Sequence, residues 1–240
     1  MTDFIHLHNH TEYSLLDGTA RIENLVSKAK AEDMSAVAIT DHGVLFGAIK
    51  FYQEAKKQGV KPIIGCELYI AEDHQQKDPR NKENYHLLLL AENNEGYRNL
   101  LKLVSTAYLD GFYYKPRVDK ELLREHNEGL IALSSCLAGR IEKLIQNRQF
   151  DKAKAEVEEY RDIFGADNFF LELQDHGLKE EKEVNNELVR LSRECDIPLV
   201  ATNDTHYLEE DDAQAHDILL CIQTGKKVSD EDRMKFPNDQ

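Results

Sequence analysis

The chain has 240 residues, of which 41% are hydrophobic, and its formal net charge is −15. This length and composition suit one large domain, or two small ones, with a sizeable core. The acidic charge argues against a nucleic-acid binder held by a broad basic face. It leaves room for a local anion site, because bound metal cations reverse the sign of the charge where they sit.

The four cysteines Cys66, Cys136, Cys195 and Cys221 are scattered, without CxxC spacing. This usage is typical of a reducing compartment, so we expect no disulfides. No apolar run reaches transmembrane length, and the N-terminus lacks the basic-then-apolar pattern of a signal peptide. We therefore expect a cytoplasmic protein that does not associate with membranes.

The first half of the chain opens with an extended segment in which His6, His8 and His10 alternate, so their side chains point to one side. Apolar spacing then predicts a helix over 21–33, a buried strand over 36–40 and a helix over 47–58. A third strand lies within 60–69, and a polar stretch at 71–84 is expected to be a loop. Residues 87–91 form a fourth apolar strand, followed by a helix from Asn93 or Asn94 to about residue 107.

The second half continues the alternation. An aromatic stretch at 108–117 precedes a short helix at 119–126 and a fifth strand at 130–136. Helices are predicted at 138–146 and 150–164, a sixth strand at 169–173 and a charged amphipathic helix at 179–195. The last elements are a strand at 199–202 and a helix at 211–223.

Seven short strands alternating with helices predict an α/β fold with a parallel sheet. If the sheet closes into a barrel, the C-terminal ends of the strands share one face, where barrel enzymes carry their sites. An open doubly wound sheet is the alternative.

Side chains that bind metals follow five of the predicted strands. Two or three imidazoles and a carboxylate at one strand end make a natural metal-binding corner, and here the pattern repeats. A free cysteine is more often a small buried hydrophobe, so Cys136 has that alternative interpretation. The residues at the strand ends are His8, His10, Asp17, Asp41, His42, Glu67, Cys136, Asn203, Asp204 and His206.

The remaining histidines are less easily placed. His86 begins a strand instead of ending it, so in a strictly parallel barrel it lies on the wrong face, and periodicity alone makes it a strand-opening polar residue. His176 follows a strand and is expected near the site. His74, His126 and His216 are interpreted as surface residues.

Four motifs carry a family resemblance: HLHNHTEYSLLDG at 6–18, ITDHG at 39–43, IGCELY at 64–69 and ATNDTHY at 201–207. They resemble the PHP (polymerase and histidinol phosphatase) domain. The similarity covers essentially the whole chain and is closest to the branch at the N-terminus of bacterial DNA polymerase III alpha subunits.

This resemblance implies a distorted seven-stranded (β/α)7 TIM-like barrel with three divalent metal ions at the strand ends. The family match reverses the interpretation of His86 and makes it a ligand. The mixture of imidazole, carboxylate and thiolate suits zinc or manganese, with iron or magnesium as alternatives. Carried over residue by residue, the ligands are His8, His10, Asp17, His42, Glu67, His86, Cys136, Asp204 and His206.

The implied activity is metal-dependent phosphoester hydrolysis, specifically 3′–5′ exonuclease proofreading by a metal-activated hydroxide. Glu67, Asp17 and Asp204 act in it through the metal cluster, with Glu67 as the candidate bridge between ions. An alternative is a structural module that stabilises a polymerase or docks a separate proofreading exonuclease. A free-standing histidinol-phosphate-type phosphatase is a further alternative.

Lys115, Arg117 and Arg140 are candidates to hold a phosphate or the DNA backbone, and ordinary surface charge is the alternative for all three. Tyr113 and Tyr114 are candidates to stack on a frayed base, or else they pack within their own loop.

The resemblance also divides the chain into a phosphoesterase domain over 1–225 and a tail over 226–240 that leads toward polymerase domains. The expected partners are a DNA 3′ end, those polymerase domains and other replisome subunits.

Overall fold

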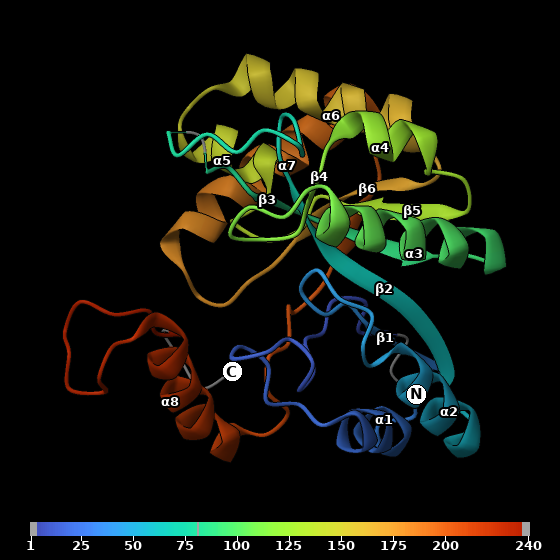
Figure 1. The fold of residues 1–240 in the computed structure, drawn as a ribbon, viewed down its shortest axis with the longest axis vertical. Helices are drawn as coiled ribbons and strands as arrows, with labels where there is room; N and C mark the ends of the chain where they lie inside the picture. Colours follow the sequence, from blue (N-terminus) through green and yellow to red (C-terminus); the bar gives the residue numbers. More distant parts are fainter. Residues whose placement is uncertain (1–3, 81, 237–240) are drawn as a thin grey trace.

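The computed structural model describes residues 4–80 and 82–236, and Figure 1 shows a curled mixed sheet with helices packed against its outside. The strand order is β1-β2-β3-β5-β6-β7, with β4 paired to β2. The α/β barrel-like architecture expected from the sequence is confirmed. The strands are β1 (Ala36–Ile39), β2 (Lys61–Ile70), β3 (Tyr85–Ala91), β4 (Arg117–Val118), β5 (Leu130–Leu133), β6 (Phe169–Leu173) and β7 (Leu199–Ala201).

The helices agree with the apolar periodicity to within a few residues at their ends. None of those in the described part of the chain is long and apolar enough to cross a membrane. They are α1 (Ile22–Ala31), α2 (Ala48–Gln58), α3 (Asn94–Leu109), α4 (Lys120–Glu125), α5 (Arg140–Gln146), α6 (Phe150–Phe164), α7 (Lys179–Cys195) and α8 (Ala213–Thr224), with a 3₁₀ turn η1 (Glu210–Asp212) before α8.

The expectation of an all-parallel sheet is wrong at β3. This strand pairs antiparallel with β2 on one side and with β5 on the other, whereas β1–β2, β5–β6 and β6–β7 are parallel. The long β2 continues to Ile70 and the chain returns directly beside it, as a hairpin-type connection requires. The start of β3 therefore lies at the same edge of the sheet as the ends of β1 and β5.

The opening segment is extended but is not a regular strand. It lies between the two ends of the sheet: the amide of Ala38 in β1 donates to the carbonyl of His6, and the amide of Thr205, after β7, donates to the carbonyl of His8. The ladder is interrupted because the amides of Asn9 and Thr11 donate to side chains, Thr40 Oγ1 at 2.9 Å and Asp41 Oδ1 at 2.7 Å. The segment thus closes the barrel with irregular backbone.

The core has two main parts. In the larger one, β2, β3, β5 and β6 pack against α3, α5, α6 and α7, and the leucines of β3 are almost entirely inaccessible to solvent. In the smaller one, α1 and α2 pack on β1. Burying each leucine or isoleucine stabilises the fold by about 1.5–3 kcal/mol, so these contacts hold the strand ends in register.

The C-terminal segment turns back on the domain after Gly225. Arg233 donates to Asp217 of α8 through two hydrogen bonds, one of them 2.8 Å long. The ring of Phe236 lies 5.4 Å from that of His206 and 4.9 Å from that of His216. Of the tail predicted at 226–240, residues 237–240 lie outside the described residues.

Candidate metal centre

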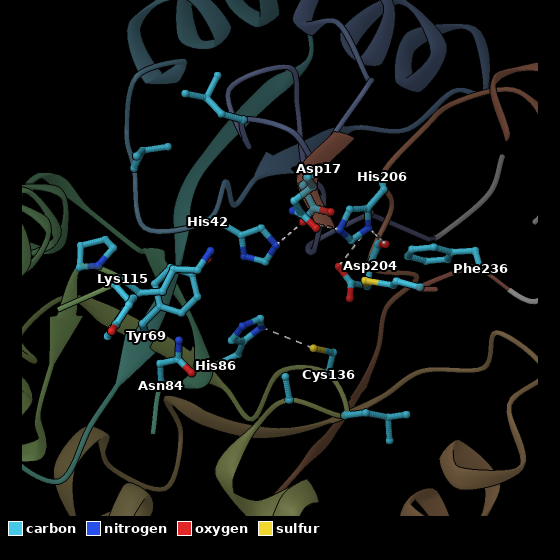
Figure 2. Close-up of a pocket in the computed structure, with 18 of the residues that line it drawn as sticks. Asp17, His42, Tyr69, Asn84, His86, Lys115, Cys136, Asp204, His206 and Phe236 are labelled. Carbon is cyan, nitrogen blue, oxygen red and sulfur yellow. Dashed lines mark hydrogen bonds and ion pairs between the residues drawn. The ribbon is translucent and has the colours of Figure 1, made fainter. Parts of the chain in front are cut away.

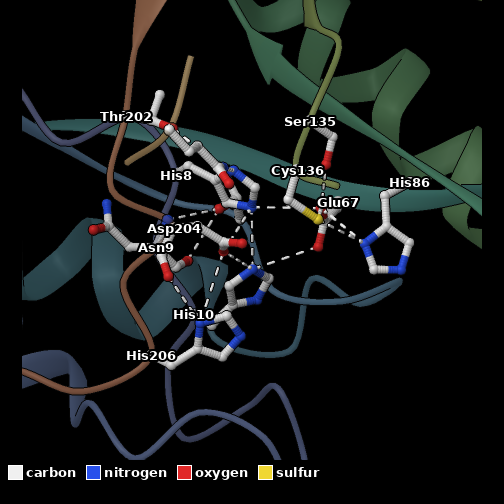
Figure 3. Close-up of polar contacts among 12 residues, drawn as sticks. His8, Asn9, His10, Glu67, His86, Ser135, Cys136, Thr202, Asp204 and His206 are labelled. Atoms are coloured by element: carbon white, nitrogen blue, oxygen red, sulfur yellow. Dashed lines mark hydrogen bonds and ion pairs between the residues drawn. The ribbon is translucent and has the colours of Figure 1, made fainter. Parts of the chain in front are cut away.

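Glu67, near the middle of β2, is the centre of the polar cluster (Figure 3). The side chain is 1% exposed, and its carboxylate oxygens lie 3.5 Å from His8 Nε2, 3.4 Å from His10 Nε2 and 3.0 Å from His86 Nδ1. A fourth imidazole, that of His42, comes within 2.7 Å. One carboxylate therefore faces four imidazoles from three separate segments.

The tightest group is His8, His10 and Asp204. The two Nε2 atoms are 3.1 Å apart, and each lies 3.1 Å from Asp204 Oδ1. Ligands about 2.0–2.1 Å from a tetrahedral zinc are about 3.3 Å from one another. These three donor atoms therefore outline one face of a zinc-sized tetrahedron.

A second group lies on the other side of His10. Asp17 Oδ2 is 2.8 Å from His42 Nε2 and 3.4 Å from His206 Nε2. The ring of His10 contacts those of His42 and His206, with centroid distances of 4.1 and 4.4 Å. The two groups are consequently neighbours within one continuous cluster.

His86 and Cys136 complete the third side. Cys136 Sγ lies 3.6 Å from His86 Nδ1 and 3.9 Å from Glu67 Oε1. His86 reaches the cluster because β3 runs antiparallel to its neighbours, which places the first residues of that strand at the site. The periodicity-based interpretation of His86 as an unrelated polar residue was wrong about its location, since it assumed a parallel strand.

All nine residues expected as ligands thus converge. Three overlapping groups within the described residues have donor atoms close enough for one ion each: His8–His10–Asp204, His10–His42–His206 and His42–Glu67–His86.

Buried hydrogen bonds orient the imidazoles. Glu172 Oε1 lies 2.7 Å from His8 Nδ1, and Ser14 Oγ lies 2.9 Å from His10 Nδ1, so the Nε2 atoms of both rings face the cluster. Such partners fix the ring orientation and tautomer of metal-binding histidines. Glu172 is visible in the sequence as the one carboxylate within the apolar strand β6.

Asp41 has an orienting role instead of facing the cluster. Its carboxylate accepts from the amide and hydroxyl of Thr11 and from Ser14 Oγ at 2.7–3.0 Å. It therefore holds the loop that carries Asp17.

Strained backbone occurs beside the cluster. Asp204 itself has φ 47°, and Ser135 and Leu16, which precede Cys136 and Asp17, have φ 75° and 64°. Non-glycine residues in this left-handed region each cost about 1–3 kcal/mol and gather at functional sites. The strain is offset by the surrounding hydrogen bonds and aims the three neighbouring side chains inward.

The pKa values follow from this crowding of charges. Burial, together with the imidazoles of His42 and His206, lowers the pKa of His10 to about 3, so its Nε2 keeps a free lone pair. Burial opposes protonation of His42, but Glu67 and Asp17 outweigh it and raise its pKa to about 10. Burial likewise opposes ionisation of Asp204, and His8 and His206 more than offset it and lower the pKa of this carboxyl. Acidic groups this concentrated require cations, and metal ions would supply them in place of protons.

The three basic candidates have different surroundings. Lys115 lines the pocket above the cluster, with its ammonium 5.0 Å from the centre of the Tyr69 ring (Figure 2). Arg117 is buried and donates to the backbone carbonyls of Gly111, His74 and Gln76. Its contacts therefore hold a loop together and lie away from the pocket.

Arg140 is likewise engaged within the chain. Its guanidinium pairs with Glu72 and Glu156 and lies 5.1 Å from the centre of the Tyr85 ring. Of the two tyrosines, Tyr114 lines the pocket, and its ring packs edge-on against Tyr113 with the centroids 4.6 Å apart.

The other histidines correct two expectations. His216 on α8 is 1% exposed and packs against His206, so its interpretation as a surface residue was wrong: the amphipathic helix turns this side chain toward the site. His74 is half-buried against Asp119 at 2.5 Å, so it too is not a plain surface residue. His126 caps α4 and is half-exposed. His176 lies at the pocket as expected, with Nε2 2.6 Å from the carbonyl of Asn203.

A pocket of about 650 Å³ opens above the cluster. Its floor includes Asp17, His42, His86, Asp204 and His206, and Figure 2 shows Tyr69 and Lys115 on one side and Phe236 on the other. This volume lies within the range of small-ligand pockets. Neither Tyr69 nor Phe236 was predicted as a site residue: Tyr69 ends the motif at 64–69 without being a ligand type, and no motif includes Phe236.

The match to known families decides what kind of domain this is. The model of the PHP domain family matches residues 6–176. The chain belongs to the PHP domain family. The resemblance inferred from the motifs is thereby confirmed.

Curated relatives and a solved structure are also similar to this chain. The chain is similar to DNA polymerase III subunit alpha of Borreliella burgdorferi, with 53% identity over 99% of this chain, and of Treponema pallidum, with 50% identity over 99%. It spans about a fifth of the length of these proteins (21% and 20%). A proposed metal-dependent phosphoesterase from Bifidobacterium adolescentis has the same fold, with a TM-score of 0.51, 16% identity and coverage of 84% of this chain and 87% of the other.

Proposed function

We propose that this PHP domain is a metal-dependent phosphoesterase that removes nucleotides from a DNA 3′ end. The observation that carries the proposal is the convergence of nine ligand-type side chains beneath a pocket with room for a nucleotide. Similarity to DNA polymerase III alpha subunits supports DNA as the substrate.

The donor set fits divalent metal ions. Among the described residues, two buried carboxylate oxygens of the cluster, Glu67 Oε2 and Asp204 Oδ1, lie beside imidazole nitrogens but form no hydrogen bond of suitable geometry. A buried carboxylate oxygen in this situation is costly unless a cation binds it. The mixture of nitrogen, oxygen and sulfur favours zinc or manganese over magnesium, which prefers oxygen ligands.

Bound divalent ions would lower the pKa of a water molecule and draw charge from the phosphoryl oxygens. The side chains of His8, His10, His42, Glu67 and Asp204 would hold those ions. The chain supplies two further groups at the pocket. Burial, reinforced by Glu67 and Asp17, raises the pKa of Tyr69, so its phenol stays protonated and would donate to the oxygen of a bound phosphate. Lys115, 3.3 Å from the Tyr69 hydroxyl, places a positive charge beside it.

The test combines metal analysis with a nuclease assay on the same preparation. Asp17→Asn and Asp204→Asn should each abolish release of 3′-labelled nucleotides from single-stranded and mismatched DNA while the chain stays folded. Asp167→Asn, in an exposed turn, is the matched control and should keep full activity. Nucleotide release that survived both cluster substitutions would contradict the proposal.

The two alternatives predict different results in the same experiment. A structural or docking module would bind metal and a proofreading exonuclease but release no nucleotide. A small-molecule phosphatase would hydrolyse histidinol phosphate in preference to DNA.

A further inference from the structure

We propose that the rim of the pocket binds unpaired nucleobases, so that the site accepts the single-stranded terminus of a polynucleotide and rejects a paired one. The rim is formed by Leu15, Phe46, Phe112 and Tyr114, which all line the pocket. The proposal rests on the function proposed above and defines its substrate class.

The rim is unusually apolar for a solvent-exposed surface. Phe46 is 63% exposed, Tyr114 65% and Leu15 71%, and they come from three different loops around one opening. Large apolar side chains gathered at the mouth of a pocket usually mark a binding surface. Flat rings also suit bases in particular, because every base offers an aromatic face for stacking.

The aromatic rings are held in place for stacking. The rings of Phe112 and Tyr108 stack on each other, 6.1 Å apart and inclined by 25°. Tyr114 has φ 61°, a backbone conformation that a tyrosine adopts only under constraint, and it turns the ring toward the opening. The ammonium of Lys82 lies 4.8 Å from the centre of that ring.

Positive charge connects the rim to the floor. Lys115 is next to Tyr114 in the chain, and its ammonium lies over Tyr69, whose ring is 5.2 Å from that of His86. A phosphate at the floor and the next phosphate at Lys115 would leave the attached base at the rim. The positive charge that would attract a phosphate is confined to this part of the pocket, since the chain as a whole has a net charge of −15.

The depth of the floor explains why the base must be unpaired. Asp17 and His206 are 8% and 7% exposed, on the floor of a cavity of about 650 Å³. A phosphodiester must descend into this cavity to reach them, and a rigid duplex cannot follow. Unpairing costs a few kcal/mol, least at a mismatched end, and stacking on the rim would offset it.

The experiment compares Phe46→Ala/Phe112→Ala with wild type and with Ile49→Ala, which removes a similarly exposed side chain (60%) outside the pocket. Dissociation constants are measured with a labelled single-stranded oligonucleotide whose terminal linkages resist hydrolysis, and with the matching blunt duplex. KM and kcat are measured with the hydrolysable strand and with methyl p-nitrophenyl phosphate, which is too short to reach the rim.

The double variant should raise the Kd and the KM of the single strand at least about tenfold, the loss expected for removed base stacking. Metal content, turnover of the small diester and the behaviour of Ile49→Ala should not change. Phe112→Trp should retain the affinity, since the indole also stacks.

Equal single-strand affinity in the double variant and wild type would overturn the proposal. So would equal binding of the blunt duplex by wild type, or no oligonucleotide binding at all, as expected if the rim packs against another protein domain. Failure of the proposed function gives a different result: wild type hydrolyses neither the oligonucleotide nor methyl p-nitrophenyl phosphate. In that case, weaker oligonucleotide binding by the double variant would still support the rim as a base-binding surface.

Discussion

The floor and the rim of the pocket are built in opposite ways. The donors of the metal cluster at and beneath the floor are buried or half-buried, and neighbouring groups orient them, as Glu172 does His8 and Ser14 does His10. The rim side chains Phe46 and Tyr114 are more than half exposed and come from loops. The difference shows where precision is needed: metal ligands tolerate errors of only tenths of an ångström, whereas stacking on bases tolerates variation in position.

The largest effect should come from the centre of the metal cluster, beneath the floor. Glu67→Gln removes the negative charge that faces four imidazoles. Loss of several kcal/mol of electrostatic stabilisation should lower nucleotide release by about 10³-fold or more and reduce the bound metal. Metal content and single-turnover rates measure both effects. Unchanged metal content with unchanged activity would show that Glu67 is not at the centre.

The next largest effect should come from the core beneath the floor. Leu89 of β3 is fully buried opposite Cys66 of β2, so Leu89→Ala should lower the free energy of unfolding by about 2–5 kcal/mol. Leu109→Ala, at a site that is 81% exposed, is the control and should change it by less than about 0.5 kcal/mol. Urea denaturation measures the difference, and equal effects would mean that β3 does not support the floor.

A smaller effect should follow from removing the hydrogen bond that orients His8 in the metal cluster. Glu172→Gln removes the carboxylate that orients His8 but leaves all nine expected ligands in place. Substitution of such a partner typically lowers metal affinity or activity 10–100-fold. Metal titration with a competing chelator tests this. The same substitution should leave single-strand binding through the rim almost unchanged, which separates the two regions.

The smallest effect concerns Glu142 in α5, behind Cys136. Burial raises the pKa of this carboxyl well above its ordinary value. A raised pKa in the folded state means that its stabilising contribution is present below the unfolded pKa of about 4.3 and is lost as the pH rises. Glu142→Gln should therefore gain stability relative to wild type between pH 5 and 8, by on the order of 1 kcal/mol.

Thermal denaturation across that pH range checks the prediction for Glu142. Glu183→Gln on the exposed face of α7 is the control and should show no such trend. A stability difference between Glu142→Gln and wild type that did not vary with pH would show that Glu142 is ionised in the folded chain.

Local pattern predicted most elements because each helix and strand buries one face or both. The apolar run of β3 and the amphipathic spacing of α7 are visible in the sequence and agree with the structure. The direction of β3 could not be predicted, because nothing within residues 85–91 indicates that the strand is antiparallel to its neighbours. His86 was therefore placed correctly only by the family resemblance.

Burial of individual polar residues also escaped the sequence. Arg117 looked like a candidate phosphate contact, yet its guanidinium lies among backbone carbonyls of a loop distant in sequence. His216 was predicted to be a surface residue, but in the structure α8 packs its ring against that of His206. Both errors have the same cause, because a polar side chain acquires its partners only when segments far apart in the chain meet.

By itself, the sequence determined the α/β class and the family, since period and motif are local properties, and the nine expected ligands follow from the family resemblance. Only the tertiary structure decided that β3 is antiparallel and that the opening segment joins β1 to the chain after β7. It also decided which groups orient the imidazoles and which aromatic rings surround the opening. These features depend on contacts between segments that are far apart in the sequence, and no single segment contains the information that selects one packing over another.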